Sequence, residues 1–324
     1  MTDRPQTLAS SPIKPDSSRV MLGIGLKLIS VVVFVAMSSF IKSTDGIPAG
    51  QLVFFRSFFA IFPIMIFLAY QGELVSGFKT DRPFGHMWRG LIGVVSMSLT
   101  FYGLTKLPLP ESIAIGYASP LLIVMLSALV LKETVRLYRW SAVMIGLVGV
   151  MIILWPRLTV FTDPSAFADE EALGALATLG SAFMAAGAML MVRTLVKTEK
   201  SATIVIYFSL TSSVLALASI PFGWAWPSPT DWAFLIGAGV AGGIGQVLLT
   251  ECYRHADMSI IAPFEYSSLI LGVGVGYLFF GDVPTPAMLV GGAIVVGAGI
   301  FIIYREHRLG LERTRARKVS TPQG

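Results

Sequence analysis

Ten long apolar segments recur along this chain, and they decide what it can fold into. A helix needs about 20 apolar residues to cross the hydrocarbon core of a bilayer. The segments lie at approximately 21–41, 51–70, 89–106, 111–131, 138–155, 172–193, 203–224, 232–253, 259–280 and 287–304. The gaps between them are mostly short, and none is long enough for a soluble domain. We therefore predict an all-α integral membrane protein with ten transmembrane helices.

Composition excludes the usual soluble classes. Of the 324 residues, 54% are apolar and only 13% are charged. A soluble domain carries about twice that share of charged residues. The net charge of +5 is spread over short loops, and no nucleic-acid-binding motif is present, so we expect no nucleic-acid partner.

Lysine and arginine predict the orientation, because loops on the cytoplasmic side of a membrane are enriched in both. With the N-terminus in the cytoplasm, nineteen of these residues fall on the cytoplasmic side. Only Lys42, Lys106 and Arg157 fall on the other side, while Lys27 and Arg56 lie inside apolar segments. We expect both termini, residues 1–20 and the basic tail 305–324, to be cytoplasmic.

The two halves of the chain resemble each other. The stretch "ESIAIGYASPLLIVMLSALVLKE" begins at Glu111, and "SIIAPFEYSSLILGVGVGYLFFGD" follows about 150 residues later. Each repeat, 21–155 and 172–304, holds five segments, with a periplasmic linker at 156–171. Five is an odd number, so the repeats must insert with opposite orientations. Inverted repeats are typical of secondary transporters with a substrate site near mid-membrane; a duplication without functional meaning is the alternative.

Arg56 is a candidate site residue because it interrupts the run "FFRSFF". The predicted topology places it about 8 Å inside the outer boundary. Two interpretations remain open. The side chain either snorkels to the interface, or it faces the outer mouth of a cavity and pairs with an anionic group.

Glu265 is the second candidate, in the stretch "APFEYSS". A carboxylate inside a membrane segment is costly and usually functional. Pro263 removes a backbone donor and leaves a carbonyl free. We expect Glu265 to couple protons or bind substrate, and the alternative is a structural partner such as Arg254 or Tyr266.

Uncharged polar residues inside other segments could line a pocket or join helices. The candidates are Tyr102, Tyr117, Ser119, Pro120 and Gln246, and Tyr266 is added as a neighbour of Glu265. Ser, Thr and Gln in membranes more often join helices.

A glycine motif and several missing motifs limit the other function classes. Residues 237–243 read "GAGVAGG", which matches a dinucleotide-binding pattern, but they lie in a membrane-length apolar segment. We expect these glycines to serve close helix packing. The sequence shows no metalloprotease, serine-hydrolase or Walker A motif, no metal-ligand cluster and no cofactor site, so an enzyme is not expected.

These motifs resemble the drug/metabolite transporter superfamily, in its ten-helix EamA-repeat branch. The resemblance covers about residues 20–305 and depends on "FFRSFFA", "RGLIGVVSMSLTFYGL", "YASPLLIVMLSALVLKE", "GLVGV" and "APFEYSSLILGVGVGYLFFGD". It implies two inverted five-helix bundles, with helices 3, 4, 8 and 9 near a central cavity. The second repeat departs from the family pattern in having Asp282 rather than Glu.

The resemblance also implies a function. "LKLISVVVFVAMSSFIK" together with "APFEYSS" is most similar to bacterial riboflavin transporters of the RibN type. The expected activity is alternating-access transport across the bacterial inner membrane, with riboflavin uptake as the first hypothesis. Transport of an amino acid, S-adenosylmethionine, a nucleoside or a drug is the alternative, and a membrane scaffold or enzyme is a remote one. The expected partners are a small-molecule substrate and membrane lipid, and a homodimer stays open.

Overall fold

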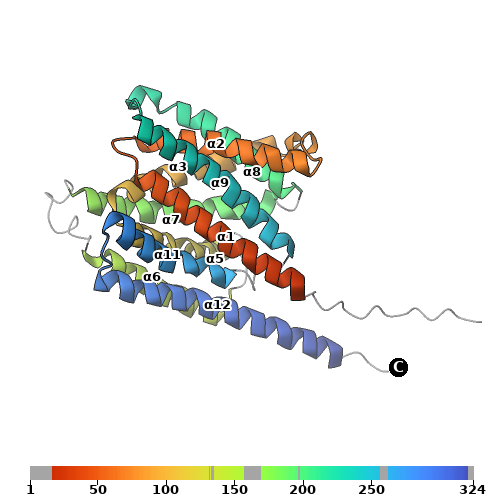
Figure 1. The fold of residues 1–324 in the computed structure, drawn as a ribbon. Coiled ribbons are helices and arrows are strands. Elements are labelled where there is room, and N and C mark those ends of the chain that lie inside the picture. Colours follow the sequence, from red (N-terminus) through yellow and green to blue (C-terminus); the bar gives the residue numbers. More distant parts are fainter. Residues whose placement is uncertain are drawn as a thin grey trace, which may run out of the picture.

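The computed structural model describes residues 17–319, apart from 131, 133–134, 157–168, 196–197 and 256–261. The described part is helical throughout, with no strand (Figure 1). Its main elements are α1 (Ser17–Lys42), α2 (Ala49–Tyr70), α3 (Pro83–Lys106), α4 (Leu109–Gly116), α5 (Ala118–Val130), α6 (Leu137–Leu154), α7 (Glu170–Leu195), α8 (Ser201–Leu217), α9 (Pro229–His255), η5 (Ala262–Tyr266), α11 (Ser267–Val275), η6 (Gly276–Phe280) and α12 (Pro286–Val319). Two short turns, η1 (Ser76–Phe78) and η4 (Ile220–Phe222), lie in loops.

These elements account for the ten predicted segments. Eight stretches of the described chain are long and apolar enough to span a bilayer. In two of them, several elements share one span: α4 with α5, and η5 with α11 and the π-helical η6. The 24-residue α3 and the shorter apolar α8 complete the ten. The prediction of an all-α membrane protein with ten spans is thus confirmed.

The structure extends two of the predicted segments with polar residues. Helix α3 begins at Pro83, not at Arg89. Arg89 therefore lies within the helix rather than in a loop, and it is no longer one of the positive charges counted in cytoplasmic loops. Proline is favoured in the first turn of a helix, where its missing N–H has no partner to lose. Helix α12 continues to Val319, so the basic stretch from Arg305 to that residue is helical. Hydropathy detects the membrane boundary, which is not the end of the helix.

The fourth span breaks at Tyr117, between α4 and α5. Pro120 has no N–H to donate to the carbonyl of Gly116, so the continuous hydrogen-bond ladder is interrupted there. The ninth span is irregular at the equivalent place, where the 3₁₀ turn η5 precedes α11. Both spans also end on a residue with left-handed backbone: Lys132 has φ +52° and Gly281 has φ +67°.

Helix packing follows a two-fold relation between the repeats. Helix α1 packs against α9, and its counterpart α7 packs against α3 in the same way. The equivalent pairs α2 and α8, α4 and α11, and α6 and α12 also pack together. Helices α1 and α7 begin at opposite ends of the bundle, as inverted repeats require (Figure 1).

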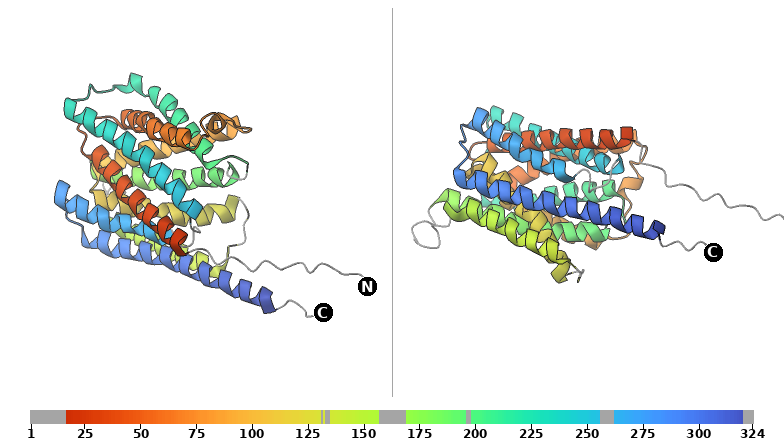
Figure 2. Two further views of the ribbon diagram at one scale, coloured as in Figure 1. Left: turned by 45° about the vertical axis from the view of Figure 1, so that its right-hand side comes forward. Right: turned by 90° about the horizontal axis from the view of Figure 1, so that it is seen from below.

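The bundle has α6 and α12 along one side and α2 with α8 along the other (Figures 1 and 2). The start of α1 and the end of α12 lie at the same end of the bundle (Figure 2). A chain with an even number of spans ends on the side of the membrane where its first span begins. The predicted tail 1–20 is outside the described residues up to position 16, as is most of the predicted linker, 157–168.

Polar contacts join the two repeats at each end of the bundle. At one end, the Asp282 carboxylate accepts a hydrogen bond of 2.8 Å from the backbone N–H of Leu109 and lies 3.6 Å from the Lys42 ammonium. At the other end, the Glu199 carboxylate accepts hydrogen bonds from Thr80 and from the backbone N–H of Asp81. Burial disfavours the charged form of Glu199, but these hydrogen bonds outweigh it and lower the pKa of that carboxyl.

Candidate functional site

The Glu265 carboxylate forms an ion pair with Lys27. Lys27 belongs to α1 in the first repeat and Glu265 to η5 in the second, so the pair crosses the repeat interface. The Lys27 side chain is 1% exposed, whereas 48% of the Glu265 side chain is accessible. The carboxylate therefore contacts an enclosed cation and is itself accessible from outside the protein.

Tyr117 ties the two broken spans together beside this pair. Its hydroxyl donates a hydrogen bond of 2.8 Å to the backbone carbonyl of Glu265, and it also contacts the Ser268 hydroxyl. Its ring lies 4.9 Å from the ring of Tyr266, centroid to centroid. Tyr117 and Tyr266 are the equivalent tyrosines of the two repeats, so the pseudo-two-fold relation brings them together.

The backbone around the Glu265 carbonyl, which accepts the Tyr117 hydroxyl, is irregular. Pro263 has no N–H, and the chain from Ala262 to Tyr266 forms a 3₁₀ turn before the regular helix α11 starts. Irregular backbone is tolerated at membrane depth only where it is buried in protein or lines a cavity. In this turn, a tyrosine from the other repeat satisfies the carbonyl.

The contact between Lys27 and Glu265 depends on the charge of both members. A buried ammonium is stable only with a partner, because removing one member of a buried pair leaves an uncompensated charge. Protonation of Glu265 would remove the negative charge that holds Lys27. Because each repeat supplies one member, a change in the protonation of Glu265 acts directly on the contact between the repeats. We call Lys27, Tyr117, Glu265, Tyr266 and Ser268 the inter-repeat cluster.

Arg56 lies inside the bundle and does not snorkel. Its side chain is 5% exposed, seven residues from the start of α2. The guanidinium lies against α9, since a Cβ atom built on Gly242 would be 3.0 Å from the Arg56 Nε. That Nε is enclosed and has no hydrogen-bond partner. The structure therefore favours the interpretation in which Arg56 faces the interior.

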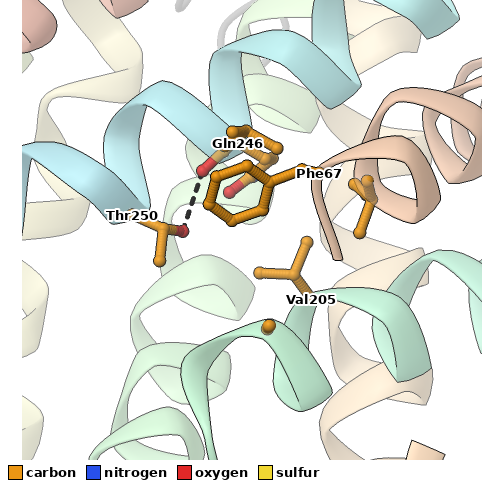
Figure 3. A pocket seen from close by; sticks show the side chains of 7 residues that line it. Phe67, Val205, Gln246 and Thr250 are labelled. Atoms are coloured by element: carbon orange, nitrogen blue, oxygen red, sulfur yellow. Dashed lines mark hydrogen bonds between the residues drawn. The ribbon is translucent and has the colours of Figure 1, made fainter. Parts of the chain in front are cut away.

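Gln246 lies in a different place, in a small pocket between α2, α8 and α9 (Figure 3). Phe67 and Val205 are also part of its lining, and the Thr250 hydroxyl donates to the backbone carbonyl of Gln246 over 2.8 Å. The pocket has room for about one water molecule. It is therefore too small for a metabolite in this conformation.

The remaining candidates have lesser roles in this conformation. Tyr102 is half-buried in α3, and its backbone carbonyl accepts a hydrogen bond from Thr105. Ser119 is half-buried in the first turn of α5. The structure thus brings Tyr117, Glu265 and Tyr266 together, while Gln246 lines the separate pocket. Within the described residues, no group of three or more His, Cys, Asp or Glu could hold a metal ion.

Sequence reasoning did not identify Lys27 as the partner of Glu265. The named alternative Tyr266 is adjacent in η5, and the side chain of Arg254 lies outside the described residues. The signal for Lys27 was its position: it is a cation within the first apolar segment. A charge of each sign in two membrane segments is a reason to test them as a pair.

Two five-helix repeats that share a polar cluster at their interface define a membrane carrier of the inverted-repeat class. The chain belongs to the EamA-like transporter family, whose sequence profile matches residues 21–155 and 172–305. The family profile thus covers both repeats.

Curated relatives with different substrates match most of the chain. The riboflavin transporter of Vibrio cholerae is 32% identical over 259 residues, which is 79% of this chain and 83% of that protein. The S-adenosylmethionine uptake transporter of Rickettsia bellii is 27% identical over 89% of this chain and 95% of its own length. The pseudopaline exporter of Pseudomonas aeruginosa is 28% identical over 86% of this chain and 94% of its own length.

A solved crystal structure has the same fold. It superimposes with a TM-score of 0.61 at 20% identity, covering 88% of this chain and 96% of that one. The family match makes the chain a multi-pass membrane transporter, and its relatives differ in substrate and in direction of transport.

Proposed function

We propose that this protein is a secondary transporter that moves a small metabolite across the bacterial inner membrane by alternating access. The observation that carries the proposal is the Lys27–Glu265 ion pair across the repeat interface. Breaking and remaking this contact would let the repeats rock against each other around the inter-repeat cluster. The start of α1 and the end of α12 lie at one end of the bundle, which we take to be the cytoplasmic end from the distribution of lysine and arginine.

Protons are the coupling ions in this proposal. The Glu265 side chain is 48% accessible and can exchange a proton, while Lys27 is enclosed and responds to the charge of its partner. In the deprotonated state the ion pair holds α1 against η5. In the protonated state the contact weakens, and the repeats are free to change their relative tilt.

Riboflavin is the first substrate to test, because the riboflavin transporter of Vibrio cholerae has the higher identity, 32%. S-adenosylmethionine is the second, because the transporter of Rickettsia bellii matches over 89% of this chain. Expression in a bacterial riboflavin auxotroph separates them. If riboflavin is the substrate, the auxotroph should grow on low external riboflavin. Absence of growth, with the protein shown to be in the membrane, would exclude riboflavin uptake.

A further inference from the structure

Two arginines inside the bundle have no anionic partner among the residues that the structure describes. Arg56 of α2 is 5% exposed, and Arg89 lies in the second turn of α3. The Nε atom of Arg56 and the Nε and Nη1 atoms of Arg89 are enclosed and have no hydrogen-bond partner. Charged side chains within membrane proteins are normally paired, or else they mark a substrate or ion path. The inter-repeat cluster uses neither arginine.

Helices of the second repeat pack against these arginines. The Arg89 guanidinium lies over the ring of Phe208 in α8, 3.6 Å from its centroid. Stacking covers one face of a guanidinium and leaves the N–H groups at its edge free. Ser212 is one turn further along α8, fully buried, and its hydroxyl has no hydrogen-bond partner. Helices α2, α3 and α8 pack against one another, and each carries an unsatisfied donor.

Electrostatics makes this arrangement unfavourable without a ligand. Arg56 and Arg89 bring two positive charges into helices that pack against each other. Two like charges with unsatisfied donors in an apolar bundle cost free energy that a buried anion would recover. The lack of a side chain at Gly242 lets Arg56 lie against α9, because a Cβ there would be 3.0 Å from the Arg56 Nε.

We propose that Arg56 and Arg89, assisted by the Ser212 hydroxyl, bind a carboxylate or phosphate group of the transported metabolite. The planar fork of arginine matches both groups with two parallel hydrogen bonds. This inference rests on the proposed transport function and names its substrate class. S-adenosylmethionine carries a carboxylate and riboflavin carries neither group, so the inference favours an acid-bearing substrate over riboflavin itself.

Two matched pairs of compounds test the acid group directly on the purified full-length protein. S-adenosylmethionine is compared with its decarboxylated form, and riboflavin 5′-phosphate with riboflavin, by titration calorimetry. We expect the acid-bearing member of at least one pair to bind about tenfold or more tightly than the member that lacks the acid group. The first pair reports a carboxylate and the second a phosphate.

Variants assign the preference to the two arginines. Arg56→Gln and Arg89→Gln should each remove the preference for the acid, and Arg56→Lys should retain part of it, because lysine keeps the charge but loses the fork. Arg136→Gln is the control, since Arg136 is exposed at the start of α6. Loss of an unpaired buried charge should leave the melting temperature of the ligand-free protein unchanged or raise it. A purely structural role predicts a lower melting temperature.

The outcomes separate this inference from the proposed function. Equal affinity within both pairs, or a preference that survives both Arg→Gln variants, would overturn the anion site while leaving transport untouched. Binding of an acid without transport of any compound into liposomes would refute the transporter and retain the site.

Discussion

At the scale of single residues, the Lys27–Glu265 pair is unusual because its members differ so much in accessibility. Lys27 is 1% exposed and depends on its partner, whereas Glu265 is 48% exposed and can exchange protons. An exposed pair such as Lys106 and Glu170, 2.8 Å apart with Glu170 69% accessible, contributes little to stability. The enclosed lysine makes the Glu265 pair different, because it has no access to water if its partner loses charge.

Glu265→Gln should therefore lower both stability and coupled transport. Leaving Lys27 without a carboxylate should cost about 1–3 kcal/mol, measured as a lower melting temperature in detergent. The double variant Lys27→Met with Glu265→Gln should recover stability, because no buried charge remains, but should not recover accumulation driven by a pH gradient. Glu170→Gln is the control and should change neither quantity. Full accumulation by Glu265→Gln would exclude Glu265 as the proton site.

Sequence reasoning identified Glu265 as a candidate but not its partner Lys27. Glu265 is identifiable because a carboxylate in a membrane segment is rare, but its partner is 238 positions away. Only packing of α1 against η5 brings them together. Arg89 was missed for a different reason: Pro83, His86 and Arg89 make the first turns of α3 look like a loop, although His86 is 1% exposed. Hydropathy cannot recognise a polar residue that is buried among other helices.

At the scale of elements, the glycines of α9 let α1 and α2 approach closely. A Cβ on Gly237 would contact Phe40 of α1 at 3.2 Å. A Cβ on Gly239 would lie 2.3 Å from the Phe59 Cβ and 2.9 Å from the backbone oxygen of Phe55, both in α2. The stretch "GAGVAGG" therefore serves helix packing, as predicted, and not nucleotide binding.

Gly239→Ala should destabilise the bundle by about 1–3 kcal/mol, because the added methyl meets the backbone of α2 and not a side chain that can move aside. Gly25→Ala is the matched control in α1, where a Cβ would meet nothing within 4 Å. Alanine is also the better helix former, so Gly25→Ala should be neutral or stabilising. Melting temperatures in detergent compare the two. Equal melting temperatures would contradict the close contact between α9 and α2.

At the same scale, the lengths of the spans were easier to predict than their irregularities. Apolar runs gave the ten spans their approximate positions, because bilayer thickness fixes their length. The largest differences within a span are at α3, which starts six residues earlier than predicted, and at α8, which ends seven residues earlier. The break at Tyr117 was not predicted, although Pro120 gave a signal for it. The contact made at this break is visible only in the structure, where the Tyr117 hydroxyl donates a hydrogen bond to the carbonyl of Glu265.

At the scale of the whole molecule, polar contacts between the repeats occur at three levels. Asp282 and Leu109 join them at one end, the inter-repeat cluster joins them within the bundle, and Glu199 joins loops on either side at the other end. Alternating access requires that contacts at one end break while those at the other end hold. The lowered pKa of Glu199 means that its contribution to stability is present above the ordinary pKa of a glutamate and is lost as pH falls through the lowered value.

Transport into proteoliposomes tests the central claim most directly. The purified protein is reconstituted without ATP, a pH gradient is imposed, and the entry of labelled S-adenosylmethionine and riboflavin is followed over time. We predict that at least one compound accumulates above its external concentration, that dissipating the gradient abolishes the accumulation, and that Glu265→Gln does not accumulate it. Entry of both compounds no faster than into protein-free liposomes would contradict the account.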